Sequence, residues 1–179
     1  MQSENNLVWL DLEMTGLDAE KCRIIEAAVI ITDKQLNIVA EMEPIAVSQP
    51  KEALDAMDEW CTTTHAKTGL TQRVLDSEIS ESQAEDMLIE FIKEYVPYKT
   101  SPLCGNSIWQ DRRFLTKYMP KLDDYCHYRV IDVTTVKLLD DYWNETKSTF
   151  KKKNTHKALD DIRESIAELK HYKDKLFSL

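Results

Sequence analysis

The sequence predicts an α/β protein with a mixed central sheet. Extended apolar segments come first along the chain, and later short strands alternate with amphipathic helices. The chain has 179 residues, of which 42% are hydrophobic and 31% are charged. This length and composition suit a globular protein that buries one core without disulfide bonds. We therefore expect residues 1–179 to form a single domain, without an internal repeat or an interdomain linker.

The first predicted strand places two acidic residues in an apolar setting. Asp11 and Glu13 alternate with Leu10 and Leu12, so the two acids share one face of the strand and the two leucines share the other. Two buried carboxylates repel each other, and Mg²⁺ or Mn²⁺ relieves this repulsion because these ions prefer oxygen ligands. The alternative is an exposed strand edge on which both acids face solvent.

Two more extended segments follow the first strand. Residues 24–32 form a β-branched apolar run that Glu26 interrupts. Residues 34–37 resemble a turn, and residues 38–47 extend again. These segments predict a hairpin that joins the first strand in an antiparallel or mixed sheet.

Amphipathic helices occupy most of the remaining chain. Residues 80–83 read Ser-Glu-Ser-Gln, which has the form of a capping box, and apolar residues recur on one helical face from 84 to 95. That pattern predicts a helix whose apolar face belongs to the core. The other predicted elements are a helix at 51–60, a brief strand at 103–106, a helix at 110–118, a strand at 129–133, a helix at 134–143, a polar loop at 144–154 and a helix at 157–172.

The formal charge of −9 bears on the partners of the protein. A protein that follows a long nucleic-acid backbone normally presents a basic surface, because neutralising phosphates drives binding. This chain predicts at most a short nucleic-acid substrate, held by a few contacts and by metal. Its three glycines form neither a G-x-G-x-x-G motif nor a P-loop, which excludes the usual nucleotide-cofactor folds.

The sequence also predicts a cytoplasmic protein. The longest uninterrupted apolar stretch, residues 27–31, is far too short to span a bilayer. The first residues lack the basic and apolar regions of a secretory signal. The four cysteines are scattered without a C-x-x-C pair, which is typical of reduced thiols.

Two further acids lie on or beside apolar helix faces. Asp111 shares a face of the predicted helix at 110–118 with apolar residues three and four positions later. Asp161 lies at the edge of the apolar stripe of the last helix, with Asp160 beside it. The alternatives are that Asp111 only complements the helix dipole and that Asp161 is an ordinary surface charge.

A histidine precedes the last helix. His156 stands five residues before Asp161, and from the approach loop it can reach over a metal ion that Asp161 binds. The alternative is a loop or capping residue. A zinc site is not predicted, because the four histidines are dispersed and no Cys/His spacing matches one. The nearby Lys151, Lys152 and Lys153 are expected to form a solvated loop.

Three stretches together resemble the exonuclease motifs of the DEDD superfamily. They are Asp-Leu-Glu-Met-Thr-Gly-Leu-Asp at 11–18, Gly-Asn-Ser at 105–107 leading to Asp111, and His-Lys-Ala-Leu-Asp-Asp at 156–161. The histidine five residues before the last aspartate marks the His-containing branch, DEDDh. Within this branch the likeness is to enzymes that degrade very short RNA, and it covers essentially the whole chain.

The resemblance implies a ribonuclease H-like fold, with a mixed five-stranded central sheet flanked by helices and a single exonuclease domain over residues 1–179. It also implies that four acids bind two divalent ions, Mg²⁺ or Mn²⁺; these acids are Asp11, Glu13, Asp111 and Asp161. One ion activates a water and the other stabilises the leaving oxygen, while His156 is the general base. The expected reaction is 3′-to-5′ hydrolysis of very short oligoribonucleotides, chiefly dinucleotides, to 5′-mononucleotides.

The resemblance further assigns contacts to the substrate. Leu17 resembles a wedge between two bases, and Trp60 resembles an aromatic residue that stacks on one of them. The positions that surround the 5′ end of the substrate are matched by His65, Ser107, Tyr128 and Arg129. Tyr128 and Arg129 are expected to come from the second subunit of a homodimer, and Tyr128 is also expected to be catalytic. The alternatives are an ordinary helix anchor for Trp60 and simple surface packing for Tyr128 and Arg129.

Two other functions remain open. One is a related DEDDh exonuclease that acts on longer chains, such as a proofreading or tRNA-trimming enzyme. The net negative charge of the chain disfavours the longer substrate groove that such an enzyme needs. The other is a catalytically silent metal-binding interaction module, which the intact set of acids and the histidine disfavours.

Overall fold

The structure, a computed structural model, describes residues 2–144, 150–151 and 156–176. Two of the lysines in the predicted loop, Lys152 and Lys153, lie outside these ranges. The strands are β1 (Leu7–Met14), β2 (Ile24–Thr32), β3 (Ile38–Glu41), β4 (Ile45–Ala46), β5 (Pro102–Gly105) and β6 (His127–Asp132). The helices are α1 (Lys51–Asp55), α2 (Glu59–Lys67), α3 (Leu70–Asp76), α4 (Glu81–Tyr95), α5 (Ile108–Tyr118), α6 (Pro120–Tyr125), α7 (Val133–Trp143) and α8 (Ala158–Leu176).

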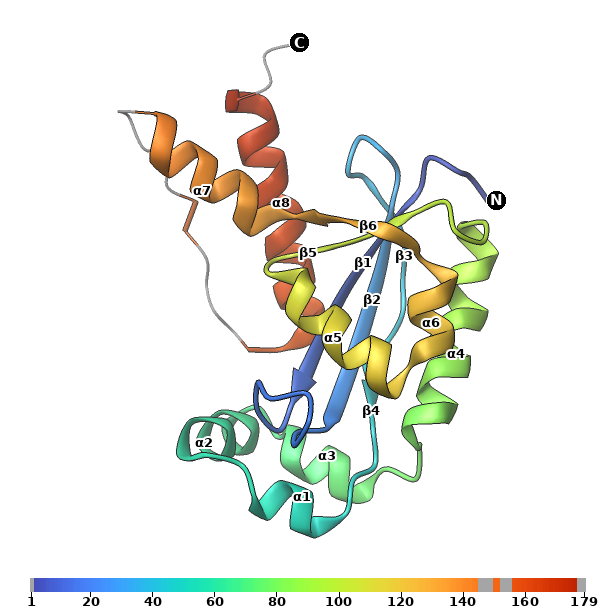
Figure 1. Cartoon of the computed structure of the whole chain (residues 1–179), viewed down its shortest axis with the longest axis vertical. Helices are drawn as coiled ribbons and strands as arrows, with labels where there is room; N and C mark the ends of the chain where they lie inside the picture. Colours follow the sequence, from blue (N-terminus) through green and yellow to red (C-terminus); the bar gives the residue numbers. More distant parts are fainter. Residues whose placement is uncertain (1, 145–149, 152–155, 177–179) are drawn as a thin grey trace.

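The strands form one mixed sheet with β1 at its centre. The order along the sheet is β3-β2-β1-β5-β6, with β4 paired to β2 off this path. β1 runs antiparallel to β2 and parallel to β5, as Figure 1 shows. β5 pairs only with Val8 and Trp9 of β1. Asp11 and Glu13 are nevertheless half-buried and lie against Asp161, so the interpretation that they face solvent on an exposed strand edge is wrong.

The predicted mixed α/β class is confirmed, but the sheet has six strands and not the five expected. The segment predicted to be extended from 38 to 47 divides into β3 and β4, with Pro44 between them. Proline has no N–H group to donate to the strand ladder. Pairing with β2 therefore stops after Glu41 and resumes at Ile45.

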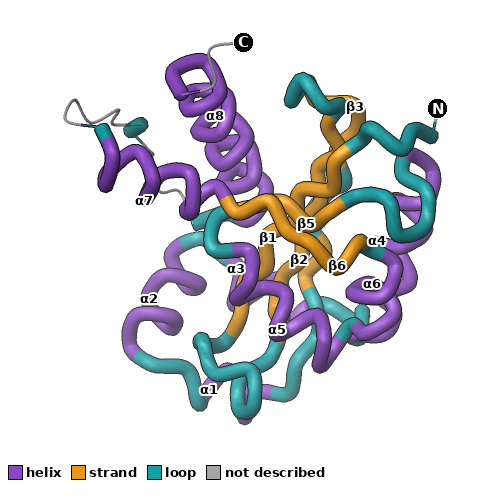
Figure 2. Tube along the Cα trace, turned by 45° about the horizontal axis from the view of Figure 1, so that its top comes forward, coloured by secondary structure: helices purple, strands orange, loops and turns teal. Residues whose placement is uncertain are grey.

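Helices cover both faces of the sheet, with α4, α5 and α6 on one side and α8 on the other (Figures 1 and 2). Successive residues of β1 alternate between the two cores. Leu10 belongs to the core beneath α4 and α5, and Trp9 belongs to the core beneath α8. Asp11 and Glu13 are two and four positions beyond Trp9, so they face the side on which α8 packs.

Most of the predicted helices are confirmed, but one of them is divided, and two helices, α3 and α6, were not predicted. The capping box is present, because the Ser80 hydroxyl accepts a hydrogen bond from the Gln83 N–H and the Gln83 side-chain oxygen accepts one from the Ser80 N–H. The helix predicted at 51–60 is instead two helices, because Asp58 caps a new helix, α2, that continues through the polar segment 62–65. Pro120 begins α6, which the sequence did not predict.

Three short helices, α1, α2 and α3, gather at one end of the sheet, beyond the carboxyl end of β1 (Figure 1). β1 therefore delivers Asp11 and Glu13 to the space between these helices and the first turn of α8. No helix in the described ranges combines the length and apolar character that a bilayer span requires.

Candidate active site

Three carboxylates from β1 and α8 converge at the carboxyl end of β1. Asp11, Glu13 and Asp161 each offer an oxygen, and these ligand atoms all lie within 4.8 Å of one another. The strand supplies two of them because residues i and i+2 share a face. The helix supplies the third from its first turn. Carboxylate oxygens in this number suit a hard divalent cation such as Mg²⁺ or Mn²⁺.

Asp111 lies next to this three-residue group. It occupies the first turn of α5 and is only 7% exposed. Its Oδ1 accepts a hydrogen bond of 3.0 Å from the backbone N–H of Leu12, which lies between the two acids of β1. The structure therefore brings all four predicted acids together, with Asp111 beside Asp11 and outside the group of three that one ion can reach.

Burial and mutual repulsion make these acids hard to ionise in the absence of a cation. The pKa of Asp11 is raised well above its usual value, first by burial and then by the charge of Asp111. Burial, followed by the charge of Asp161, raises the pKa of Glu13 to about 8. Burial raises the pKa of Asp111 to about 7. A divalent cation stabilises the ionised forms of all three, so the donor set fits a resident metal.

Asp160 and Asp161 are adjacent but have different surroundings. Asp160 accepts a hydrogen bond of 3.1 Å from the guanidinium of Arg163, which also pairs with Glu41 on β3. Asp161 faces the acids of β1 instead. Its backbone carbonyl accepts a hydrogen bond of 2.9 Å from the Ser165 hydroxyl, and that hydroxyl accepts one of 2.7 Å from the Asn106 amide. These contacts tie the first turns of α8 to the loop after β5.

His156 and Trp60 meet although they are far apart in the sequence. Their ring centroids are 5.4 Å apart in an edge-to-face arrangement. His156 has a φ of 51°, an uncommon conformation for a residue other than glycine, and its side chain is exposed. Trp60, in the first turn of α2, is 58% exposed. This exposure does not fit the interpretation of Trp60 as an ordinary helix anchor, whose ring would pack against the core.

A pocket of about 500 Å³ adjoins Glu13. Its walls include Leu17, Trp60 and His65 and are mainly apolar. Leu17 is 72% exposed, at the tip of the loop between β1 and β2. The two exposed apolar side chains predicted to contact bases thus line one pocket beside the acids.

His65 lies at the base of this pocket. It is buried, and its Nε2 is 3.1 Å from the Met14 carbonyl oxygen. Because a carbonyl only accepts, Nε2 is the donor and carries the proton. Nδ1 lies 4.0 Å from a Glu13 oxygen and has no hydrogen-bond partner among the described residues. Burial lowers the pKa of His65, which favours the neutral ring.

The other predicted substrate contacts lie outside this pocket within one chain. Ser107 precedes α5, and its N–H donates to Asp132 Oδ1 at 2.9 Å and Thr134 Oγ1 at 3.0 Å, which joins the ends of β5 and β6. Tyr128 is 72% exposed on β6, and the Arg129 guanidinium lies 5.2 Å from its ring centroid. The structure does not bring Tyr128 and Arg129 of the same chain to the pocket lining it describes.

The structure adds residues that the sequence did not single out. Asp58 and Cys61 of α2 also line the pocket. Glu26 lies opposite Glu13 in the β1–β2 register, is 2% exposed and forms an ion pair with Arg73 of α3. The signal for Glu26 was present as a lone charge within an apolar strand. Arg73 had no comparable signal, because its pairing joins distant parts of the chain.

Comparison with known proteins identifies the family. The exonuclease family model RNase_T matches residues 8–169. The chain is 68% identical over 179 residues to oligoribonuclease from Francisella tularensis subsp. tularensis (strain WY96-3418), and the match covers all of both chains. The chain belongs to the oligoribonuclease family of exonucleases. Another member, from Marinobacter nauticus (strain ATCC 700491 / DSM 11845 / VT8), is 57% identical over 180 residues, again with both chains fully covered.

Solved structures confirm the ribonuclease H-like exonuclease fold that the resemblance implied. The chain superposes on a zinc-bound E. coli ExoI–ssDNA complex with a TM-score of 0.77 and 15% identity over 99% of this chain. It superposes on Exonuclease I from Methylocaldum szegediense with a TM-score of 0.69 and 16% identity over 97% of this chain. The alignments span 42% and 41% of those longer chains. Oligoribonuclease family members are nucleases, and the carboxylate cluster suits their dependence on divalent metal.

The raised pKa values predict how pH and metal affect stability. The folded protein binds more protons than the unfolded chain between the usual pKa of Glu13, 4.5, and its folded value of about 8. The free energy of unfolding without metal should therefore fall as pH rises through this interval, and Mn²⁺ should stabilise more at high pH. Thermal unfolding in chelator and in Mn²⁺, from about pH 5 to about pH 8, measures both effects.

Glu13→Gln is the control for this prediction. It removes the titrating carboxyl, so its curve in chelator should decline less with pH than that of the wild type, and Mn²⁺ should raise its unfolding temperature less. Parallel curves for the two proteins would contradict the raised pKa assigned to the Glu13 carboxyl.

Proposed function

We propose that this protein is a 3′-to-5′ exoribonuclease that degrades very short oligoribonucleotides, chiefly dinucleotides, to 5′-mononucleotides. The observation that carries the proposal is the cluster of acids beside a small pocket with two exposed apolar side chains, Leu17 and Trp60. Full-length relatives named oligoribonuclease, 57% to 68% identical, support the same substrate class. On this proposal residues 1–179 act as a single exonuclease domain.

The proposed cofactors are two divalent ions, Mg²⁺ or Mn²⁺. The four acids would bind them, with Asp11, Glu13 and Asp161 around one position and Asp111 beside Asp11. Bound there, such ions lower the pKa of a water and offset the charge that develops on the phosphodiester. The chain contributes by holding the carboxylates in place, and the hydrogen bond from the Leu12 N–H orients Asp111.

His156 is the proposed general base. It lies on the approach to α8, a few residues before Asp161, and its exposed ring can turn toward the acid cluster. Its contact with Trp60 places it beside the pocket. A proton accepted at a ring nitrogen of His156 leaves hydroxide to attack the terminal phosphodiester.

The pocket explains the preference for a short substrate. Leu17 would separate two bases and Trp60 would stack on one, an interaction worth about 1–3 kcal/mol that is indifferent to base identity. His65 lies at the base of this pocket and Ser107 at the start of α5. We propose that these two residues, with Tyr128 and Arg129, surround the 5′ end of the substrate.

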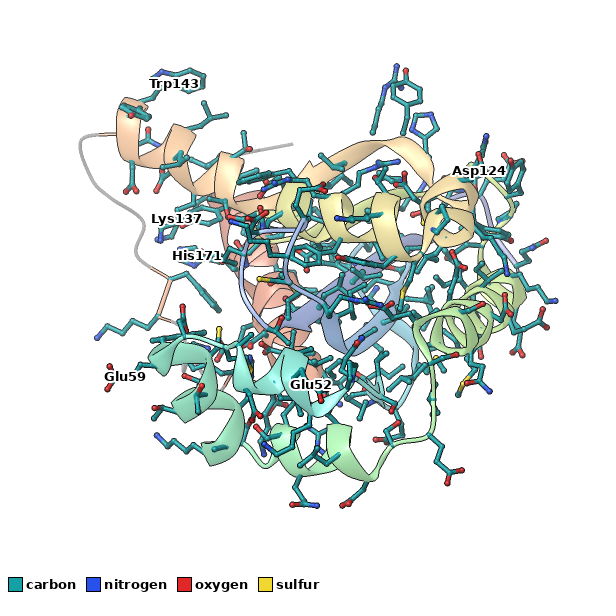
Figure 3. The ribbon with its side chains drawn as sticks, turned by 60° about the horizontal axis from the view of Figure 1, so that its bottom comes forward. Glu52, Glu59, Asp124, Lys137, Trp143 and His171 are labelled. Carbon is teal, nitrogen blue, oxygen red and sulfur yellow. The ribbon has the colours of Figure 1, made fainter. Side chains whose placement is uncertain are left out.

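A homodimer is part of the proposal, because Tyr128 and Arg129 lie outside the pocket of their own chain. Their strand, β6, is at the edge of the sheet, and α7 follows it directly. Both elements carry large exposed apolar side chains; these are Tyr128, Val130, Leu138, Leu139, Tyr142 and Trp143. Figure 3 shows Trp143 projecting from the end of α7, away from the body of the protein. A second copy would bury this apolar surface.

The proposed compartment is the cytoplasm. All four cysteines are free, and three of them are buried. Reduced thiols of this kind suit a reducing compartment.

Adjacent aspartates provide a matched test of the metal site. Asp161→Asn should reduce hydrolysis of a dinucleotide by at least about 100-fold, since it removes a metal-binding carboxylate. Asp160→Asn should stay within about twofold of the wild type, because Asp160 makes only surface contacts with Arg163. Steady-state hydrolysis and Mn²⁺ binding measure the two effects. Similar activity in both variants would show that the acid cluster is not the active site.

Mixing two impaired variants tests the contribution of the second subunit. Tyr128→Ala should weaken hydrolysis of dinucleotides but not Mn²⁺ binding, and Asp111→Ala should abolish hydrolysis. A mixture of the two forms heterodimers with one site that has both intact residues if Tyr128 acts across subunits, so activity should partly return. A mixture that contains heterodimers but is no more active than its Tyr128→Ala share alone would contradict this arrangement.

A further inference from the structure

The loop that carries Leu17 is held against one face of α5. Gln110 Nε2 donates a hydrogen bond of 2.6 Å to the Leu17 carbonyl oxygen. Further along the helix, the Tyr118 hydroxyl donates one of 3.0 Å to the Ala19 carbonyl, and Lys117 pairs with Glu20 at 2.8 Å. Residues seven and eight positions apart share a helix face. One face of α5 therefore runs along the loop between β1 and β2, as Figure 1 shows.

The orientation of the Gln110 amide is determined by its two partners. Its Oε1 accepts a hydrogen bond of 3.0 Å from the Arg113 guanidinium, which can only donate. Its Nε2 must then face the Leu17 carbonyl, which can only accept. Both ends of the amide are satisfied, so Gln110 is a defined link between the helix and the loop.

This link joins the two parts of the proposed site. The next residue of α5 is Asp111, whose carboxylate contacts the Leu12 N–H within the acid cluster. Leu17 itself is 72% exposed, so its side chain has little packing to fix it. The hydrogen bond from the Gln110 side chain to the Leu17 carbonyl therefore connects the position of the wedge to the position of the acids through the first turn of α5.

We propose that Gln110 is a positioning residue that sets the distance between the Leu17 wedge and the acid cluster. It would thereby favour dinucleotides, because the second base of a dinucleotide meets Leu17 when the scissile phosphate lies at the acids. The inference rests on the proposed function, and it adds a residue that contacts neither substrate nor metal.

Two substitutions at Gln110 test it. Gln110→Met keeps the length of the side chain but cannot donate, and Gln110→Glu keeps the acceptor for Arg113 but places a carboxylate against the Leu17 carbonyl. With a 5′-phosphorylated RNA dinucleotide, KM should rise about three- to tenfold for Gln110→Met, the range expected for one lost hydrogen bond, and further for Gln110→Glu. In both variants kcat and Mn²⁺ binding should be close to those of the wild type.

A second substrate separates positioning from damage to the acids. The p-nitrophenyl ester of thymidine 5′-monophosphate has one base, so it gains little from a wedge between two bases, and both variants should hydrolyse it like the wild type. Gln72→Met is the matched control, because it removes an exposed hydrogen bond to Asp76 within α3, and its KM for the dinucleotide should not change.

The possible results distinguish a failure of this inference from a failure of the proposed function. An unchanged KM for the dinucleotide in both Gln110 variants would overturn the inference, as would an equal loss with the dinucleotide and the ester. A wild type that hydrolyses neither substrate would instead contradict the proposed function, and this inference with it. Thermal unfolding shows whether each variant is folded. If Gln110→Met does not fold, the KM of Gln110→Glu tests the inference.

Discussion

The repulsion among four clustered carboxylates, one buried and three half-buried, is the constraint on which this site depends. Three of them, Asp11, Glu13 and Asp161, present oxygens within 4.8 Å of one another, and Asp111 adds its charge beside Asp11. A fold does not gather such groups for stability, since like charges held close together away from water cost free energy. The cost is tolerable if the site binds divalent cations, and the oxygens of the four side chains are the ligands that such cations prefer.

The scaffold imposes this arrangement through rigid elements. The central strand β1 pairs with β2 along its length, which fixes the direction of Asp11 and Glu13. Helix α5 contributes Asp111, and it also holds the Leu17 loop through Gln110. The proposed metal ligands, wedge and stacking aromatic residue therefore come from different elements, each held to its neighbour by hydrogen bonds or packing.

Much of this could be predicted from the sequence, and the exceptions have physical reasons. Alternation along β1 was enough to place Asp11 and Glu13 on one face, and helical periodicity placed Asp111 inward. The choice of Asp161 over its neighbour Asp160 was also predicted, but the pairing of Arg163 with Glu41 on β3 was not, because local patterns do not contain such a contact. For the same reason the Arg73–Glu26 pair and the Gln110–Leu17 contact were not predicted. The division of the extended segment predicted at 38–47 has a local cause, the missing N–H of Pro44, which the apolar pattern of the segment does not reveal.

The acidic character of the chain and its small pocket indicate the same kind of substrate. A formal charge of −9 disfavours a long polyanion, whereas a dinucleotide brings few phosphates and can be held by metal, stacking and local contacts. The most direct test is hydrolysis of RNA from two to about seven nucleotides long, with Mg²⁺ or Mn²⁺ and with chelator. We predict that kcat/KM is highest for the dinucleotide, falls with length, and disappears in chelator. A preference for the longest chains, or activity that survives chelation, would contradict the account.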